Sequence, residues 1–169
     1  MATKWNLDPT HSEITFKVRH MMISNVKGAF NSFSAEIEAE DDSFKNAKVS
    51  ATINIDSIDT NNADRDAHLK SADFFNAEAN STITFESTAF ADEITGNLTI
   101  NGVTKPVELE VEFGGINVDP WGNTKAGFTF EGKIKRSDFG LNWNAALETG
   151  GVLVSDDVKI SGDLQFVKG

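Results

Sequence analysis

The amino-acid sequence predicts an all-β domain of about eight strands, arranged as a barrel or as a sandwich. Apolar and polar residues alternate with a period of two along most of the chain, as in strands with one buried face. Dipeptides such as Asn101-Gly102 and Gly114-Gly115 separate the alternating runs as turns. No linker divides the 169 residues, so we expect one domain over residues 1–169, long enough to enclose a core.

The alternating runs give the expected strands in order along the chain. In the first of them, Ile14, Phe16 and Val18 alternate with polar residues. The same pattern recurs over residues 33–39, 49–55, 83–85, 94–100, 107–113, 128–134 and 158–166. The apolar positions change parity between Phe30 and Phe33, which predicts a bulge that bends a long second strand.

Two stretches break the alternation and predict one or two short helical segments. Residues 61–75 are rich in helix-forming residues, with Ala63, Ala67 and Leu69 near helical spacing. A second helical segment is expected within residues 138–149.

Small residues occupy several positions on the apolar faces. Glycine stands at positions 28, 96, 132 and 162, and alanine at 35, 39, 51 and 126. One interpretation is that the glycines only let the strands coil into a closed barrel. The other is that small residues leave a lumen, since an eight-stranded barrel is about the size that holds one ligand.

Bulky apolar residues of the same parity would line such a lumen. The chain has 13 Phe and no Tyr, so its aromatic surface is almost free of hydroxyl groups and suits an extended hydrocarbon. The residues expected to contact an apolar ligand tail are Phe16, Val18, Phe33, Ile37, Ile53, Phe85, Leu98, Leu109, Val111, Phe128, Phe130, Ile160 and Leu164.

Three polar residues are candidates for binding the head group of such a ligand. His20 continues the inward parity of its strand and would meet a head group at the barrel mouth; alternatively it is a hydrogen-bonded core histidine. Arg65 would pair with a phosphate through its planar guanidinium, or would lie on a solvated helix face. Arg136 is a further option, as is Lys105, although Lys105 precedes Pro106 at a hairpin exit.

Other conspicuous residues have simpler interpretations. His11 and Ser12 follow Asp8-Pro9-Thr10 and are expected to bond the local backbone at the start of a strand. The three tryptophans are expected to pack in the core, or alternatively at the barrel ends or along the entrance: Trp5, Trp121 and Trp143.

The composition restricts the class of function. With 15 basic and 26 acidic side chains, the chain has a formal net charge of −11, which argues against binding nucleic acids or anionic membranes. No run approaches the roughly twenty apolar residues of a membrane helix, so no membrane insertion is expected. Residues 1–5 lack a signal-peptide core, so we expect a cytoplasmic protein, or a periplasmic one if a leader was removed.

Catalytic and metal chemistry are not expected. The chain has no cysteine, and His11, His20 and His68 lack the spacing of a metal site. No nucleophile elbow or phosphate-binding loop occurs. We therefore expect a protein that is not an enzyme and that needs no cofactor or metal.

Several motifs follow one another through the whole chain: residues 5–12 (WNLDPTHS), residues 57–75 with Arg65-Asp66, and the hairpin of residues 96–107 (GNLTINGVTKPV). With residues 136–140 (RSDFG) and the closing strand at 158–160, they resemble the motifs of the YceI-like family of polyisoprenoid-binding proteins. The resemblance covers almost all of the sequence.

This resemblance implies an extended, lipocalin-like antiparallel barrel of eight strands. It implies non-catalytic binding or carriage of a long-chain isoprenoid amphiphile in the lumen, either a polyprenyl phosphate or an isoprenoid quinone. It also implies a homodimer and, for many members, export to the periplasm by a leader peptide.

Two other functions stay open at this point. One is an enzyme or redox partner that acts on a bound quinone or isoprenoid, with His20 transferring a proton. The other is a barrel with a filled core that serves only as an interaction module.

Overall fold

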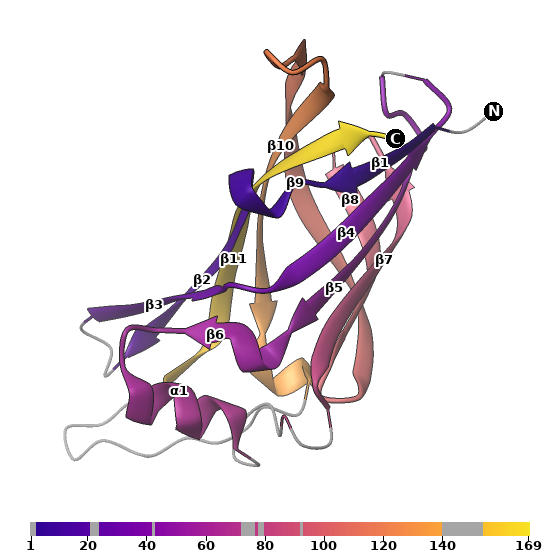
Figure 1. Ribbon diagram of the computed structural model, residues 1–169. Coiled ribbons are helices and arrows are strands. Elements are labelled where there is room, and N and C mark those ends of the chain that lie inside the picture. The colour runs from indigo at the N-terminus through magenta and orange to yellow at the C-terminus, as the bar shows by residue number, and fades with distance from the viewer. Residues whose placement is uncertain are drawn as a thin grey trace, which may run out of the picture.

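The computed structural model describes residues 3–20, 24–41, 43–71, 77, 80–91, 93–139 and 154–169 (Figure 1). The helical elements are α1 (Ala63–Lys70) and the 3-10 turns η1 (Pro9–His11), η2 (Ile55–Ser57) and η3 (Arg136–Phe139). The strands are β1 (Thr3–Leu7), β2 (Glu13–His20), β3 (Ser24–Phe30), β4 (Phe33–Ala39), β5 (Lys48–Asn54), β6 (Ile58–Asp59), β7 (Thr82–Phe90), β8 (Glu93–Ile100), β9 (Val103–Val118), β10 (Thr124–Lys135) and β11 (Val154–Lys168).

Eight antiparallel strands close into a barrel, which confirms the predicted fold. They follow the order β1-β4-β5-β7-β8-β9-β10-β11, and β11 pairs in turn with β1. The last part of β11 pairs with β1, where Phe166 faces Leu7, and its earlier part pairs with β2, where Gly162 faces Ile14. β3 and β6 continue the wall from β2. Closure leaves few free strand edges, which would otherwise be open to pairing with other chains.

The predicted bulge within one long second strand is wrong, because the structure has two separate strands there. Asn31 and Ser32 interrupt the strand completely, so that β3 pairs with β2 and β4 pairs with β1. The change of parity between Phe30 and Phe33 keeps both side chains directed toward the core despite the break. The break lets two successive strands pair with different partners in the barrel wall.

The first predicted helix is confirmed within narrower limits. α1 starts after Asn62, whose side-chain oxygen accepts a hydrogen bond from the backbone N–H of Arg65 at 3.0 Å. Asp64 and Asp66 lie in its first turn and Lys70 in its last, as the helix dipole favours. Of the second predicted helical segment, residues 138 and 139 lie in η3 and residues 140–149 lie outside the described residues.

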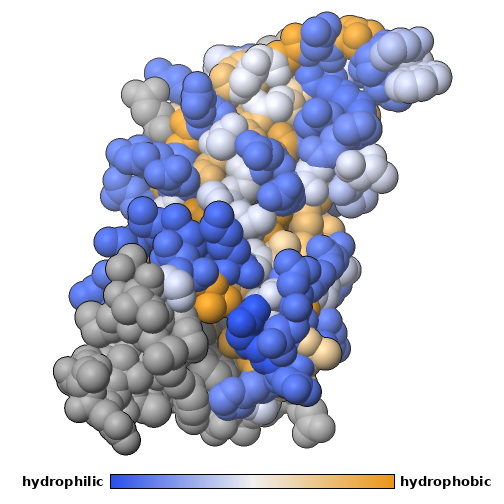
Figure 2. Space-filling view, turned by 90° about the vertical axis from the view of Figure 1, so that its left-hand side faces the viewer, coloured by the Kyte–Doolittle hydropathy of each residue, from blue (hydrophilic) through white to orange (hydrophobic). Residues whose placement is uncertain are grey.

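The barrel has two different ends (Figure 1). At the hairpin end, β9 and β10 extend past the neighbouring strands and turn through residues 119–123. At the helix end lie α1 and η3. The face shown in Figure 2 is mostly hydrophilic, with hydrophobic residues in small areas between the polar ones. No helix within the described ranges has the length and apolar character that a membrane span needs.

A polar cluster at η1 joins the start of the chain to β10. The carboxylate of Asp8 accepts hydrogen bonds from Lys125 Nζ at 2.7 Å and from the Thr10 hydroxyl at 2.7 Å, and its Oδ2 lies 2.8 Å from His11 Nδ1. These bonds, that to Lys125 above all, hold the pKa of Asp8 well below its ordinary value. The cluster fixes β1 beside the strands that close the barrel.

Ser12 joins the same turn to β11. Its hydroxyl donates to the carbonyl oxygen of Asp8 at 2.7 Å and accepts from the backbone N–H of Gln165 at 3.0 Å. The backbone N–H of Asp8 donates to the carbonyl oxygen of Gln165 at 2.8 Å. The expectation of bonds to the local backbone is therefore confirmed for Ser12, whereas the His11 ring bonds the side chains of Asp8 and Thr10 in the same turn.

Replacing Asp8 with Asn is expected to lower the free energy of unfolding by about 2 kcal/mol near neutral pH, since hydrogen bonds to an ionised group contribute about 1.5–3 kcal/mol. The folded-state pKa of Asp8 lies below the value of about 3.9 for an unfolded chain. The stabilisation by the ionised Asp8 carboxylate is therefore complete at pH values well above the unfolded-state pKa. It is lost as the pH falls from that pKa through the lower folded-state pKa. Urea unfolding of the wild type and D8N across this pH range measures the difference.

The matched control is Glu36→Gln, which removes the exposed partner of Lys4 at 3.7 Å. We expect it to change stability by less than about 1 kcal/mol. A D8N effect that stays constant as the pH falls below about 4 would contradict the role given to the ionised carboxylate.

Candidate ligand-binding cavity

An internal cavity of about 150 Å³ lies in the barrel. Every side chain in its wall is apolar except that of Thr15. Twelve of the thirteen predicted tail-binding residues line it; the exception is Val18, which is half-buried on β2. Their contact with a ligand stays a prediction. The wall also contains residues that the prediction left out, among them Ile14, Phe30, Ala35, Val49, Ala51, Ile83, Phe90, Ile94, Ile100, Val107, Ile134 and Phe166.

The inner-face glycines do not simply leave empty space, because a neighbouring side chain occupies the place of each missing Cβ. A Cβ added at Gly28 would lie 2.3 Å from Phe16 Cζ, and one at Gly162 would lie 2.3 Å from Phe130 Cε1. Phe85 covers Gly96 in the same way, and Leu109 covers Gly132. The interpretation that these glycines themselves form the lumen is therefore wrong. They let large side chains lie against the barrel wall instead of crossing the interior.

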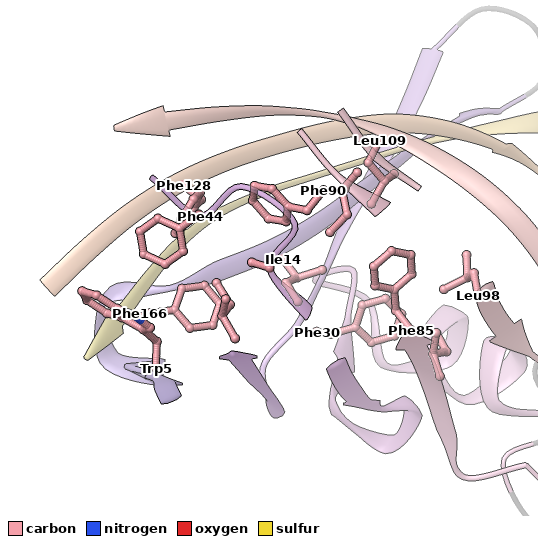
Figure 3. Close-up of a cluster of buried hydrophobic side chains, with 14 of the residues drawn as sticks. Trp5, Ile14, Phe30, Phe44, Phe85, Phe90, Leu98, Leu109, Phe128 and Phe166 are labelled. Atoms are coloured by element: carbon pink, nitrogen blue, oxygen red, sulfur yellow. The ribbon is translucent and has the colours of Figure 1, made fainter. Parts of the chain in front are cut away.

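Aromatic rings fill the hairpin end of the barrel (Figure 3). The ring of Phe44 is 1% exposed, and its centroid lies 5.2 Å from that of Trp5, 5.0 Å from Phe128 and 5.3 Å from Phe113. Phe166 packs against Phe128 at 5.9 Å. We call these five residues the aromatic seal.

Phe44 reaches the seal from the loop between β4 and β5. Its φ is +60°, a left-handed conformation that is unfavourable for a bulky residue. The burial of a whole Phe ring offsets this strain, since it contributes about 1.5–3 kcal/mol. The sequence prediction missed Phe44 because it lies outside every alternating run.

Polar groups gather at the helix end. Arg136 in η3 is 7% exposed, and burial lowers its pKa while the charge of Asp156 opposes that shift. Asp156 accepts hydrogen bonds from the backbone N–H and the hydroxyl of Ser137, both at 2.8 Å. The Ser137 backbone N–H is the main cause that lowers the pKa of Asp156. An arginine of η3 and an aspartate of β11 are thus held near each other at the helix end of the barrel.

Arg65 is held against the barrel wall by the buried Thr60. Its Nε donates to the Thr60 hydroxyl at 2.8 Å, and its guanidinium also donates to the Thr60 carbonyl oxygen. The backbone N–H of Thr60 donates to Asp66 at 2.9 Å. Arg65 therefore has a structural role in fastening α1, which sequence reasoning did not anticipate.

The three predicted head-group residues all belong to the helix end. The backbone of His20 pairs with Ser24 and Val154 there, although its side chain lies outside the described residues. Lys105 is exposed on β9. Within the described part of the chain, no group of three His, Asp or Glu residues could hold a metal ion.

The described tryptophans differ in burial. Trp5 is fully buried, as predicted, and in the described structure its Nε1 has no hydrogen-bond partner. Trp121 is 82% exposed, so its expected packing is wrong. Trp143 lies outside the described residues.

A larger open groove of about 930 Å³ lies on the outside of the barrel. It is lined mainly by charged side chains such as Lys17, Lys27, Glu110 and Glu131. Because these alternate along the strands with residues of the cavity wall, the groove suits polar contacts and not a hydrocarbon tail.

We expect Gly162→Ala to lower the free energy of unfolding by about 1–3 kcal/mol, the usual cost of overpacking. The added Cβ would lie 2.3 Å from the Phe130 ring and 2.8 Å from the carbonyl oxygen of Glu13, and the backbone oxygen cannot move aside easily. Urea and thermal unfolding measure the change.

Gly127→Ala is the matched control, because nothing lies within 4 Å of its added Cβ. It should be neutral or should stabilise the protein by about 0.4–1 kcal/mol. Equal effects of the two substitutions would show that the ring over Gly162 does not restrict that position.

Comparison with known proteins gives a consistent family and fold. The model of the YceI-like domain matches residues 5–166. A UPF0312 protein of Staphylococcus epidermidis is 42% identical over 166 residues, and one of Staphylococcus aureus is 40% identical; each match covers 97% of both chains.

Solved structures share the fold. The YCEI protein of Campylobacter jejuni has a TM-score of 0.77 and 35% identity, with 89% of this chain and 90% of that chain covered. BcnA of Burkholderia cenocepacia has a TM-score of 0.79 at 24% identity, covering 94% and 98%. A polyisoprenoid binding domain from Saccharophagus degradans has a TM-score of 0.68 at 15% identity, covering 98% of each chain.

Proposed function

Because this chain belongs to the YceI-like domain family, we propose that its barrel binds a long-chain isoprenoid amphiphile and carries it without catalysing a reaction. The observation that carries the proposal is the cavity, whose wall is apolar except for Thr15. Such a wall offers no hydrogen bonds and selects a ligand by the burial of hydrocarbon. The polyisoprenoid binding domain from S. degradans, which has the same fold, supports this choice of ligand class.

The distribution of polarity along the barrel favours an amphiphile. Apolar rings fill the hairpin end, whereas Arg136 and Asp156 lie at the helix end. We propose that the tail lies in the cavity and that the head group lies at the helix end, where Arg136 and the backbone of His20 are found. Arg65 would act there indirectly, by holding α1 through Thr60.

A long tail needs more room than the cavity of about 150 Å³ provides, since a cavity of that size holds a benzene-sized guest. Side chains of the wall would therefore move apart when the tail inserts. Their contacts are apolar packing, with no hydrogen bonds to break, and the contacts that they lose are replaced by contacts with the tail. The protein would gain stability on binding, because the ligand binds only the folded state.

Filling the cavity should prevent binding. Ala35 and Ala51 face each other across β4 and β5, and both line the cavity. We expect Ala51→Phe to reduce binding of a polyprenyl phosphate at least about tenfold, because the ring takes the space of the tail. Native mass spectrometry of delipidated protein titrated with the lipid measures this, and circular dichroism checks the fold.

Thr52→Phe adds a ring to the neighbouring position on the outer face of β5 and serves as the control. It should bind as the wild type does. Unchanged binding by a folded A51F protein would place the ligand outside the cavity and overturn the proposal.

The head-group assignment has its own test. Arg136→Met should weaken binding of a polyprenyl phosphate about tenfold or more, since charge-assisted hydrogen bonds to phosphate are lost. It should leave binding of the uncharged polyprenol and of an isoprenoid quinone nearly unchanged. Lys135→Met removes a charge from the adjacent exposed residue as a control.

An R136M protein that binds all three lipids as the wild type does would show that the head group lies elsewhere. Equal loss for all three lipids in a folded protein would point to an effect of Arg136 on the cavity itself.

A further inference from the structure

The β9–β10 hairpin ends in an exposed apolar surface, the hairpin tip, formed by Phe113, Ile116, Val118 and Trp121. Their exposed fractions are 43%, 36%, 60% and 82%, and they are the exposed large hydrophobic residues of the described chain. In Figure 2, hydrophobic residues show at the upper end of the molecule, which is the hairpin end in Figure 1. Side chains of this size are rarely exposed together without a partner.

Strand register explains why these residues are exposed. Ile116 pairs with the buried Ala126, and Phe113 pairs with Phe128, which lines the cavity. Phe113 and Ile116 of the tip therefore lie on the continuation of the inner face, and Trp121 follows in the turn between the two strands. β8 pairs with β9 only from Val103 to Glu110, so in the described structure the inner face of the hairpin continues past the wall that would cover it.

The hairpin tip is also connected to the cavity. The rings of Phe113 and Phe128 stack with centroids 5.1 Å apart and an interplanar angle of 25°. The apolar surface thus runs from the cavity wall, through the aromatic seal, to the outside. The tail end of the proposed ligand would lie on this side of the protein.

The turn that carries Trp121 is held by hydrogen bonds. Asp119 Oδ1 accepts from the backbone N–H groups of Trp121 and Asn123, both at 2.9 Å. The backbone N–H of Asp119 donates to the carbonyl oxygen of Asn123 at 2.9 Å, and the backbone N–H of Gly122 donates to the carbonyl oxygen of Asp119 at 3.1 Å. The exposure of Trp121 is therefore built into an ordered turn.

The tip carries almost no charge in a strongly acidic protein. Between residues 113 and 125, the charged side chains are Asp119 and Lys125, which lie 3.8 Å apart, and Lys125 also bonds Asp8. The remainder of the chain carries the net charge of −11. An anionic surface would repel this protein, whereas an electrically neutral surface would not.

We propose that the hairpin tip docks the protein on the surface of a neutral, zwitterionic lipid bilayer, with Trp121 and Val118 in the interfacial layer. Tryptophan is enriched at membrane–water interfaces because its ring is apolar and its N–H is polar. Docking of this kind is peripheral and needs no membrane-spanning segment. It goes beyond the binding of an isoprenoid in the cavity and places the tail end of that cavity against lipid.

A second copy of the chain fits the tip less well. A stable dimer buries about 800 Å² on each partner. Large aromatic side chains bury about 150–250 Å² each when fully covered, so four partly exposed side chains offer a few hundred Å². That area suits a small interfacial anchor.

Flotation with phosphatidylcholine vesicles tests the proposal on the full chain. The wild type should float with the vesicles, and its tryptophan emission should shift to the blue and be quenched by lipids brominated near the headgroup. Trp121→Ala should reduce vesicle binding about tenfold and remove the shift, whereas Trp143→Phe, which leaves the buried Trp5 and the exposed Trp121 in place, should keep both. Adding phosphatidylglycerol to the vesicles should weaken binding at low salt, and added salt should restore it.

Two variants that each introduce one aspartate, at different places, provide the matched control. Val118→Asp adds a negative charge at the tip and should abolish flotation, whereas Ala67→Asp adds the same charge at an exposed position of α1 and should not. A wild type that fails to float would overturn the proposal. So would equal losses for V118D and A67D, or a concentration-dependent dimer that W121A abolishes while flotation is unchanged.

The flotation test can fail or succeed independently of isoprenoid binding in the cavity. W121A and V118D should bind an isoprenoid in the absence of vesicles as the wild type does, and A51F should still float. Loss of flotation with intact lipid binding concerns the tip, and loss of lipid binding with intact flotation concerns the cavity.

Discussion

Closure of the barrel depends on the two partners of β11. β1 and β2 are separated by the turn η1, so neither of them pairs with the whole of β11. β2 pairs with the earlier part of β11, and β1 pairs with its last part. The bonds of Asp8 to Lys125 and of Ser12 to Gln165 hold η1 beside β10 and β11 at this junction. Without them, the N-terminal strands would lose their fixed position and the interior would open to water. The apolar cavity, the aromatic seal and the separation of the two ends all follow from a wall that closes here.

Closure also sets the width of the interior, and the glycines then decide how that width is used. In a barrel of eight strands, large side chains from every wall would meet and fill the centre. Phe16, Phe85 and Phe130 instead lie over glycines of neighbouring strands. The glycines therefore do not form the lumen directly: they let the large side chains of neighbouring strands lie flat against the wall. The space that results is narrow, and the side chains that line it contact one another almost entirely through apolar packing.

The sequence predicts those features that depend on strand parity. The period of two identifies the inward-facing residues, and twelve of thirteen line the cavity. Parity cannot show where a strand leaves the barrel, so Trp121 was wrongly expected to pack. It also says nothing of loops, and Phe44 enters the seal from one, in a left-handed conformation that no neighbouring residue signals. The partner of Arg65 was missed because Thr60 becomes buried only when α1 folds back on the wall.

The two ends of the molecule are chemically opposite, and this asymmetry has a physical consequence. At the helix end, the buried guanidinium of Arg136 lies near the exposed carboxylate of Asp156, so that end carries charge and resists contact with a lipid layer. The hairpin tip exposes apolar side chains, and the charged residues between positions 113 and 125, Asp119 and Lys125, pair with each other. Lys125 also bonds Asp8, so the same lysine fastens the start of the chain to β10 and offsets one negative charge beside the tip. A protein with a charge of −11 can approach a lipid surface favourably only through such a region, which fixes the orientation in which it would dock.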